Sequence, residues 1–123
     1  MDPFDFERHV MSFFQEAGFK SSVTKASNDF GIDGWAVHEE GLIIVQCKRN
    51  SDKNKVGRPT IQQFKGVLEE QGKTNNIYKG YIVTTSSFSK DAIESASLNS
   101  NLILIDLEEL SRWHILGFNL DKA

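Results

Sequence analysis

Apolar residues recur at helical spacing in the first part of the chain. At about 100° per residue, the apolar positions of this segment share one arc roughly 180° wide. They are Phe4, Phe6, Val10, Met11, Phe13, Phe14 and Ala17. Asp2 can cap such a helix with Pro3 in its first turn, and Gly18 is suited to its end. The pattern predicts an amphipathic helix over residues 3–17.

Alternating and continuous apolar runs follow this helix and predict three strands. Residues 19–25 and 32–38 alternate, and a turn is expected over residues 28–31 between them. A tight connection at residues 39–41 then leads into residues 42–48, which are β-rich and almost entirely apolar. That last run is typical of a central strand covered on both faces.

The second half of the chain alternates helical and strand patterns. The predicted elements are a helix over 58–72, a strand over 78–85, a helix over 90–98, a strand over 102–105 and a helix from 106 onward. Ser89 is a good N-cap, and Asp106 begins a sequence resembling a capping box. The order α–β–β–β–α–β–α–β–α predicts an α/β domain with a mixed central sheet flanked by helices.

Length and composition indicate an ordinary globular chain. With 123 residues and 39% hydrophobic residues, we expect a single domain over residues 1–123. The longest apolar run, Leu42 to Val45, is far shorter than the roughly 18 residues of a membrane span, and no secretory leader is evident. One cysteine excludes an internal disulfide. We therefore expect a cytoplasmic protein that does not bind membranes.

Charge is distributed unevenly along the chain. The net charge is −3, which argues against a generic nucleic-acid coat protein. Residues 46–66 nevertheless carry six basic residues against one acidic residue, a local charge of +5. Such a run can be a solvated face, or it can be a surface that approaches a phosphate backbone.

The predicted hairpin brings candidate chemistry together. If Glu40 is its centre, paired residue numbers sum to about 80, and Asp33 lies opposite Cys47. Gln46 and Lys48 then share one face of their strand, while Cys47 points to the other face. Carboxylate and amide oxygens suit Mg²⁺, and a neighbouring ammonium can stabilise phosphate charge. The alternative is a salt bridge between Asp33 and Lys48 at the strand end.

Glu7 interrupts the apolar arc of the first helix. It falls between Phe14 and Met11 on the helical wheel, where a carboxylate is costly unless it is paired or binds a cation. The alternative is a favourable place near the helix N-terminus, close to solvent.

Four segments carry a resemblance to a known family. The chain resembles the Mrr-type nuclease domain of the restriction-endonuclease-like PD-(D/E)xK superfamily, from about residue 4 to residue 110. The segments are Phe6-Glu7, Gly31-Ile32-Asp33-Gly34, Val45-Gln46-Cys47-Lys48-Arg49 and Val83-Thr84-Thr85-Ser86-Ser87-Phe88-Ser89, with Ala92 after the last. The resemblance implies a restriction-endonuclease-like fold with a mixed central sheet flanked by helices.

The resemblance also implies an activity and a metal. Asp33 and Gln46 match the family's metal-binding positions, Lys48 matches the catalytic lysine, and Glu7 matches a first-helix acid that completes the metal site. Gln63 on the second helix is expected to face this site. A Mg²⁺-dependent DNA endonuclease acting in restriction or defence is the resulting hypothesis. Gln46 carries no charge, so Mn²⁺ is an alternative metal.

DNA contacts are expected beside this site. The basic residues that follow Lys48 would meet the phosphate backbone of double-stranded DNA. They are Arg49, Lys53, Lys55 and Arg58. Ser86 and Ser87 lie between a strand and a helix, where they can hold an anion or only cap the helix. A homodimer or a partner domain for target recognition is consistent with this family.

A different class of function competes with the nuclease. The same fold could bind DNA or a partner protein without cutting, and such a module would not depend on Mg²⁺ or Asp33. The three histidines, His9, His38 and His114, are far apart in the sequence, so a histidine metal site is not expected. Cys47 is interpreted as a core residue.

Overall fold

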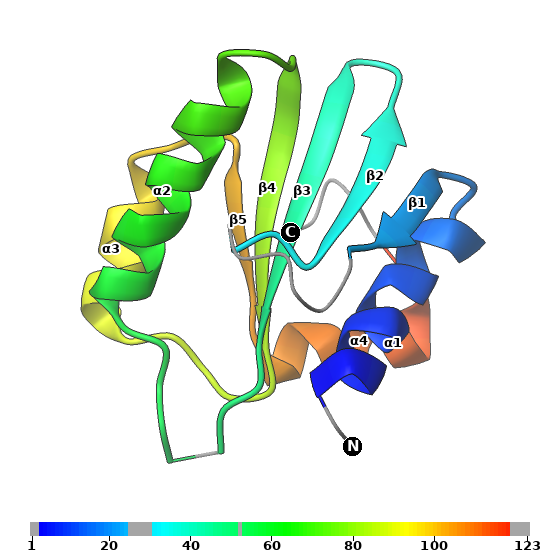
Figure 1. Cartoon of the computed structure of the whole chain (residues 1–123). Coiled ribbons are helices and arrows are strands. Elements are labelled where there is room, and N and C mark those ends of the chain that lie inside the picture. The colour runs from blue at the N-terminus through cyan, green and yellow to red at the C-terminus, as the bar shows by residue number, and fades with distance from the viewer. Residues whose placement is uncertain (1–2, 25–30, 52, 119–123) are drawn as a thin grey trace.

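The computed structural model describes residues 3–24, 31–51 and 53–118. Its centre is a five-stranded sheet with the strand order β1-β2-β3-β4-β5 (Figure 1). The strands are β1 (Lys20–Val23), β2 (Gly34–His38), β3 (Gly41–Lys48), β4 (Ile77–Thr84) and β5 (Leu102–Ile105). The first three pair antiparallel, and β3, β4 and β5 pair parallel. The sheet is therefore mixed, as the sequence predicts.

Helices cover both faces of this sheet. They are α1 (Pro3–Glu16), α2 (Arg58–Gly72), α3 (Lys90–Ser97) and α4 (Leu107–Leu116). α2 and α3 lie on one face and α1 and α4 on the other (Figure 1). The observed order confirms the predicted one, and most bounds differ by one or two residues. In the described part of the chain, no helix is long and apolar enough to cross a membrane.

Each pair of helices encloses its own apolar core. On one face, Phe14 of α1 and Trp113 of α4 pack with Tyr81 of β4, and all three are buried. On the other face, Phe64 of α2 packs with Ile82 of β4. Burial of both faces explains why the sequences of β3 and β4 are so continuously apolar.

Helix starts follow the predicted chemistry in α3 and α4. Ser89 Oγ accepts a hydrogen bond from Ala92 N at 3.1 Å, and Asp106 Oδ1 accepts one from Glu109 N at 2.9 Å. Both caps are therefore confirmed. α2 is different, because its N-cap is Gly57 and no side chain caps its first amides. The predicted cap Asp2 and residues 28–30 of the predicted turn lie outside the described residues.

The β2–β3 hairpin differs from the predicted register by one residue. His38 pairs with Gly41 and Gly34 with Val45, so paired numbers sum to 79 rather than 80. The turn contains two residues between paired positions, not three centred on Glu40. This register places Asp33 across from Gln46, and the predicted pairing of Asp33 with Cys47 is wrong by one residue.

The hairpin turn is closed by specific backbone contacts. Gly41 has a φ of 147°, and a Cβ there would lie 2.6 Å from Asn76 O. Asn76 Nδ2 donates to Glu40 O at 2.8 Å, and Leu42 N donates to Asn76 O at 2.7 Å. A glycine is therefore required at this turn.

Candidate active site

β3 extends beyond its partner β2, and Asp33 occupies the space that this leaves. The β2–β3 ladder ends at the pair of Gly34 and Val45, while β3 continues to Lys48. Asp33 N donates to Val45 O at 2.8 Å, and Cys47 N donates to Asp33 Oδ2 at 2.7 Å. The carboxylate thus satisfies a strand amide that β2 does not reach.

Two glycines let other elements approach Asp33 from opposite faces of the sheet. A Cβ on Gly31 would lie 3.0 Å from Gln46 Nε2, and Gly31 has a φ of 72°. A Cβ on Gly34 would lie 2.5 Å from Met11 Sδ of α1. The Gly-Ile-Asp-Gly segment therefore has a packing reason for each glycine, and α1 comes close to the start of β2.

Gln46 carries a buried oxygen that makes no hydrogen bond. The residue is 7% exposed, and its Oε1 has no partner among the described residues. Leaving a buried acceptor unsatisfied costs about 1–3 kcal/mol, so such groups are uncommon in folded proteins. A bound ligand that accepts electron density from this oxygen would remove that cost.

The side chains of β3 alternate as the sequence predicts. Cys47 packs against the core beneath α1 and α4, and Gln46 is directed to the face covered by α2. Burial raises the pKa of the Cys47 thiol, and the negative charges of Asp33 and Glu7 raise it further. Both carboxylates therefore lie close enough to Cys47 to act on its thiol.

Lys48 ends β3 on the same face as Gln46. Its side chain is partly exposed, and in the described part of the chain it forms no salt bridge. The alternative interpretation of a strand-end ion pair with Asp33 is therefore wrong. The ammonium remains available to a negatively charged ligand.

The donor atoms at this strand end suit a hard divalent cation. Within residues 3–24, 31–51 and 53–118, no group of three or more His, Cys, Asp or Glu side chains is placed to hold a metal. The donors that the sequence predicts are the carboxylates of Asp33 and Glu7 and the amide oxygen of Gln46. Oxygen donors of this kind fit Mg²⁺ or Mn²⁺, which retain several waters. The unpartnered Oε1 of Gln46 supports that fit.

A hydroxyl-rich segment after β4 fixes the loop that follows β3. Thr85 Oγ1 donates to Asn50 O, and Ser86 Oγ donates to Asn54 O, each at 2.7 Å. Val56 N also donates to Ser87 O at 2.8 Å. Ser86 is 6% exposed, so its hydroxyl serves the loop and is not presented to a phosphate. The sequence analysis identified these serines as anion-holding or helix-capping residues, but it did not predict that the hydroxyls fix the loop after β3.

The loop presents its cations to solvent next to Lys48. Four basic side chains are exposed, and none of them forms a salt bridge in the described part of the chain. They are Arg49, Lys53, Lys55 and Arg58.

Gln63, predicted to face the site, is exposed on α2 and lies one helical turn before Val67. The Val67 side chain lies near Gly31, and Gly31 in turn lies beside Gln46.

A pair of histidines was not predicted at all. His9 of α1 and His114 of α4 lie side by side, with their Nε2 atoms 3.0 Å apart. The pKa of His9 is lowered by burial and by His114, and Glu16 opposes this shift. Local sequence patterns carry no signal for a contact between residues 105 positions apart.

The fold is a mixed sheet with helices on both faces, and an acid, an amide and a lysine lie at the end of its central strands. These features define a restriction-endonuclease-like protein. The chain matches the Mrr_cat family, described as a restriction endonuclease, over residues 1–114. It therefore belongs to this family.

Similar proteins agree with this assignment. The type IV methyl-directed restriction enzyme EcoKMrr of Escherichia coli (strain K12) is 37% identical over 87 residues. The alignment covers 68% of this chain and 27% of EcoKMrr, so the chain spans only a small part of that relative.

Two solved structures share the fold. Protein AF1548, of unknown function, has a TM-score of 0.74 at 17% identity, covering 94% of this chain and 64% of that chain. The DNA modification-dependent restriction endonuclease AspBHI has a TM-score of 0.71 at 17% identity, covering 95% of this chain and 32% of that chain.

Proposed function

We propose that this chain is a metal-dependent endonuclease domain that hydrolyses phosphodiester bonds in double-stranded DNA, in restriction or defence. One observation carries the proposal. Where β3 extends past β2, Asp33 accepts a hydrogen bond from Cys47 N, the buried Oε1 of Gln46 has no partner among the described residues, and Lys48 ends the strand. A cation bound to Gln46 Oε1 would satisfy this acceptor, which supports the proposal.

The roles of the residues follow from their chemistry. Asp33 and Gln46, with Glu7 assisting, would hold Mg²⁺ or Mn²⁺, and such an ion activates water and offsets phosphate charge when bound. The Asp33 carboxylate accepts a hydrogen bond from Cys47 N through Oδ2, which leaves Oδ1 outside that bond. The Lys48 ammonium stabilises negative charge that develops on the phosphate and orients the attacking water.

The basic loop supports DNA as the substrate. Arg49, Lys53, Lys55 and Arg58 provide contacts that are independent of sequence and sensitive to salt. Thr85 and Ser86 act as positioning residues, since their hydroxyls fix the loop backbone. The structural neighbour AspBHI is a DNA modification-dependent restriction endonuclease, which also favours DNA as the substrate.

The wider organisation is part of the same proposal. We infer that residues 1–123 form one catalytic domain, and that target recognition or cleavage of both strands involves a second copy or another domain. The aligned part covers 27% of EcoKMrr, so the activity of the whole relative is not carried over to this chain.

Cleavage of supercoiled plasmid tests the function directly. Plasmid cleavage by wild type, Asp33→Asn and the control Asp91→Asn is measured in the presence of Mg²⁺, Mn²⁺ or EDTA. Asn can still accept the hydrogen bond from Cys47 N, so the fold is preserved while the charge is lost. Asp91 is exposed in the first turn of α3 and is neither a proposed metal ligand nor a loop cation. Metal-dependent nicking should occur in wild type and the control and be lost in Asp33→Asn.

A binding module without catalysis is the competing outcome. It would show no cleavage with any metal, and its affinity for DNA would be equal in wild type and Asp33→Asn. Cleavage that persists in Asp33→Asn would contradict the assigned metal site while leaving a nuclease activity to explain.

A further inference from the structure

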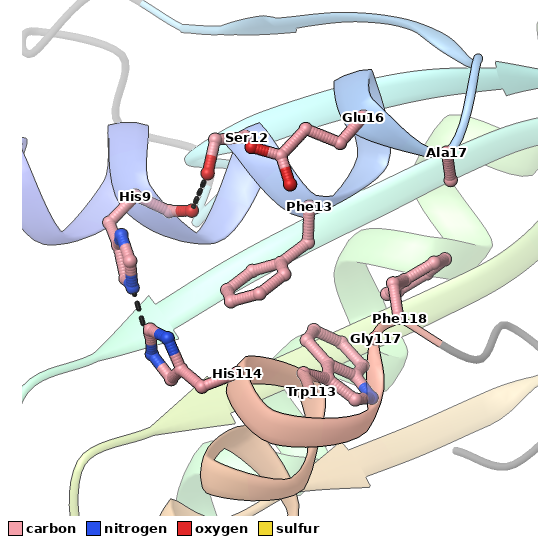
Figure 2. A pocket seen from close by; sticks show the side chains of 9 residues that line it. All are labelled: His9, Ser12, Phe13, Glu16, Ala17, Trp113, His114, Gly117 and Phe118. Carbon is pink, nitrogen blue, oxygen red and sulfur yellow. Dashed lines mark hydrogen bonds between the residues drawn. The ribbon is translucent and has the colours of Figure 1, made fainter.

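Two imidazoles from distant parts of the chain meet between α1 and α4 (Figure 2). The Nε2 atoms of His9 and His114 are 3.0 Å apart. The rings are stacked, with centroids 4.7 Å apart and planes 20° from parallel. This pair belongs to neither the nuclease site nor the basic loop.

Phe13 holds both rings in place. Its ring meets His9 edge-on at a centroid distance of 5.3 Å and His114 at 5.1 Å. Phe13 in turn contacts Trp113 at 5.5 Å, and both are buried. Because the supporting aromatic rings are buried, the two imidazoles are arranged in advance rather than by chance contact of mobile side chains.

An open pocket of about 490 Å³ adjoins the pair. Ser12 and Glu16 line it from α1, and Trp113 and Phe118 line it from the other side (Figure 2). The Ser12 hydroxyl donates to His9 O at 2.6 Å, which fixes this wall of the pocket. The pocket has room for water or a small ligand beside both Nε2 atoms.

We propose that His9 and His114 bind a transition-metal ion of the Ni²⁺ or Cu²⁺ class through both Nε2 atoms. Imidazole is a preferred ligand of these ions. Two nitrogens each about 2.05 Å from one ion lie about 2.9 Å apart at a right angle and about 3.3 Å apart at the tetrahedral angle. The observed 3.0 Å matches the right angle of tetragonal or octahedral coordination.

The remaining coordination positions would be filled from the pocket. In the part of the chain that the structure describes, no third His, Cys, Asp or Glu is placed to complete a metal site with the pair. Water is therefore the expected ligand there. Without the ion, the two Nε2 atoms share a hydrogen bond, so one of them carries a proton. On binding, that ring would move this proton to Nδ1, so that both Nε2 lone pairs are available to the ion.

An ion at this position would connect α1 to α4 and stabilise the folded state. A ligand that binds only the folded protein raises its melting temperature, and the rise grows with the logarithm of the ligand concentration above Kd. The nuclease site lies elsewhere and offers oxygen donors, so Ni²⁺ and Mg²⁺ should be separable by competition.

The test uses the whole chain without a histidine tag, with Ni²⁺ as the probe in excess Mg²⁺. Melting temperature and calorimetry are measured for wild type, His9→Gln and His114→Gln. Gln preserves a polar group at the Nε2 position but is a weak ligand for Ni²⁺. The controls are His38→Gln, whose ring stacks on Tyr78 instead, and Asp33→Asn in the nuclease site.

We expect one Ni²⁺ per chain and a rise in melting temperature in wild type and both controls, reversed by EDTA. The rise should be lost in His9→Gln and in His114→Gln. The proposal is overturned if wild type shows no rise, or if the rise persists in both histidine variants. Loss of the rise only in Asp33→Asn would also overturn it, by placing the ion in the nuclease site.

Discussion

The two ends of strand β3 use polar groups in opposite ways. At the hairpin end, Asn76 binds the turn with both its backbone and side chain, and the turn amide of Glu40 donates to His38 Nδ1 at 3.0 Å. At the other end, Gln46 Oε1 is buried without a partner, and Lys48 forms no salt bridge among the described residues. Polar groups are paired within the fold at the hairpin end, whereas a buried acceptor is left unpaired at the other end.

The charges near the two ends of β3 also differ, being acidic at the hairpin end and basic at the other. Glu39 and Glu40 form the hairpin turn, whereas Lys53 and Lys55 lie in the loop after Lys48. The net charge of −3 therefore conceals a separation of charge along one strand. Polar groups at the hairpin end stabilise the fold, while those at the other end are the ones to which the proposed function gives an anionic substrate and its metal.

Substitution of Lys48 should give the largest effect. Lys48→Ala removes the ammonium proposed to stabilise the phosphate, and we expect cleavage to fall about 10²–10³-fold. The free energy of unfolding should change by less than about 0.5 kcal/mol, because the side chain is partly exposed. Plasmid cleavage and denaturant unfolding measure the two quantities. Lys73→Ala at the hairpin end is the control, and equal losses in both variants would refute the comparison.

Substitution of Gly41 should lower the stability of the fold without lowering the cleavage activity. Gly41→Ala forces a side chain onto a φ of 147° and toward Asn76 O, and we expect unfolding to become easier by about 1–3 kcal/mol. Cleavage per folded molecule should not change. The control Gly66→Ala meets no atom within 4 Å in α2 and should raise stability by about 0.5–1 kcal/mol. A loss of specific activity in Gly41→Ala would show that the two ends are coupled.

Gln46→Leu separates stability from activity at one residue. It removes the unpartnered oxygen and keeps the volume, so we expect stability to rise by about 1 kcal/mol. Metal-dependent cleavage should fall at least about tenfold, because a proposed ligand is lost. Thermal unfolding and cleavage are compared with Gln62→Leu, an exposed position on α2. A destabilised Gln46→Leu would mean that the oxygen already has a structural role.

The loop cations should give the smallest single effects. We expect Lys53→Gln and Lys55→Gln each to lower the slope of log affinity for DNA against log salt by about 0.9. Titrations at several salt concentrations measure this slope. Lys73→Gln, whose ammonium lies 3.3 Å from Glu70, should leave it unchanged. An unchanged slope in both loop variants would remove the loop from the DNA-binding surface.

Local patterns predicted the elements well and the contacts between them less well. The helices and strands have clear periodicity, and alternation along β3 correctly separated Cys47 from Gln46. The register was wrong by one because it depends on the backbone of the turn at Gly41, which residue type does not determine. The ends of elements depend on such local geometry as well.

The predicted site was incomplete for a related reason. The fold places Asp33 beside β3 by a side-chain hydrogen bond to Cys47 N, which no pattern indicates. The contact of His9 with His114 depends on how α1 packs beside α4. Both features are tertiary, and spacing along one element carries no information about them.

The unusual start of α2 has an electrostatic consequence. Helices favour acidic residues in their first turn and basic residues in their last, because of the macrodipole. α4 follows this rule with Glu108 and Glu109 at its start and His114 near its end. α2 reverses it, with Arg58 at its start, Glu69 and Glu70 at its end and no side-chain cap.

Each charge placed against the macrodipole costs about 0.3–1 kcal/mol at low ionic strength. The positive pole of α2 and its arginine therefore reinforce one another beside the basic loop. A polyanion bound at this end would relieve the repulsion. The unliganded protein is therefore less stable than it would be without this repulsion. Substitutions that correct the charges of α2 would make the protein more stable and a weaker partner for DNA.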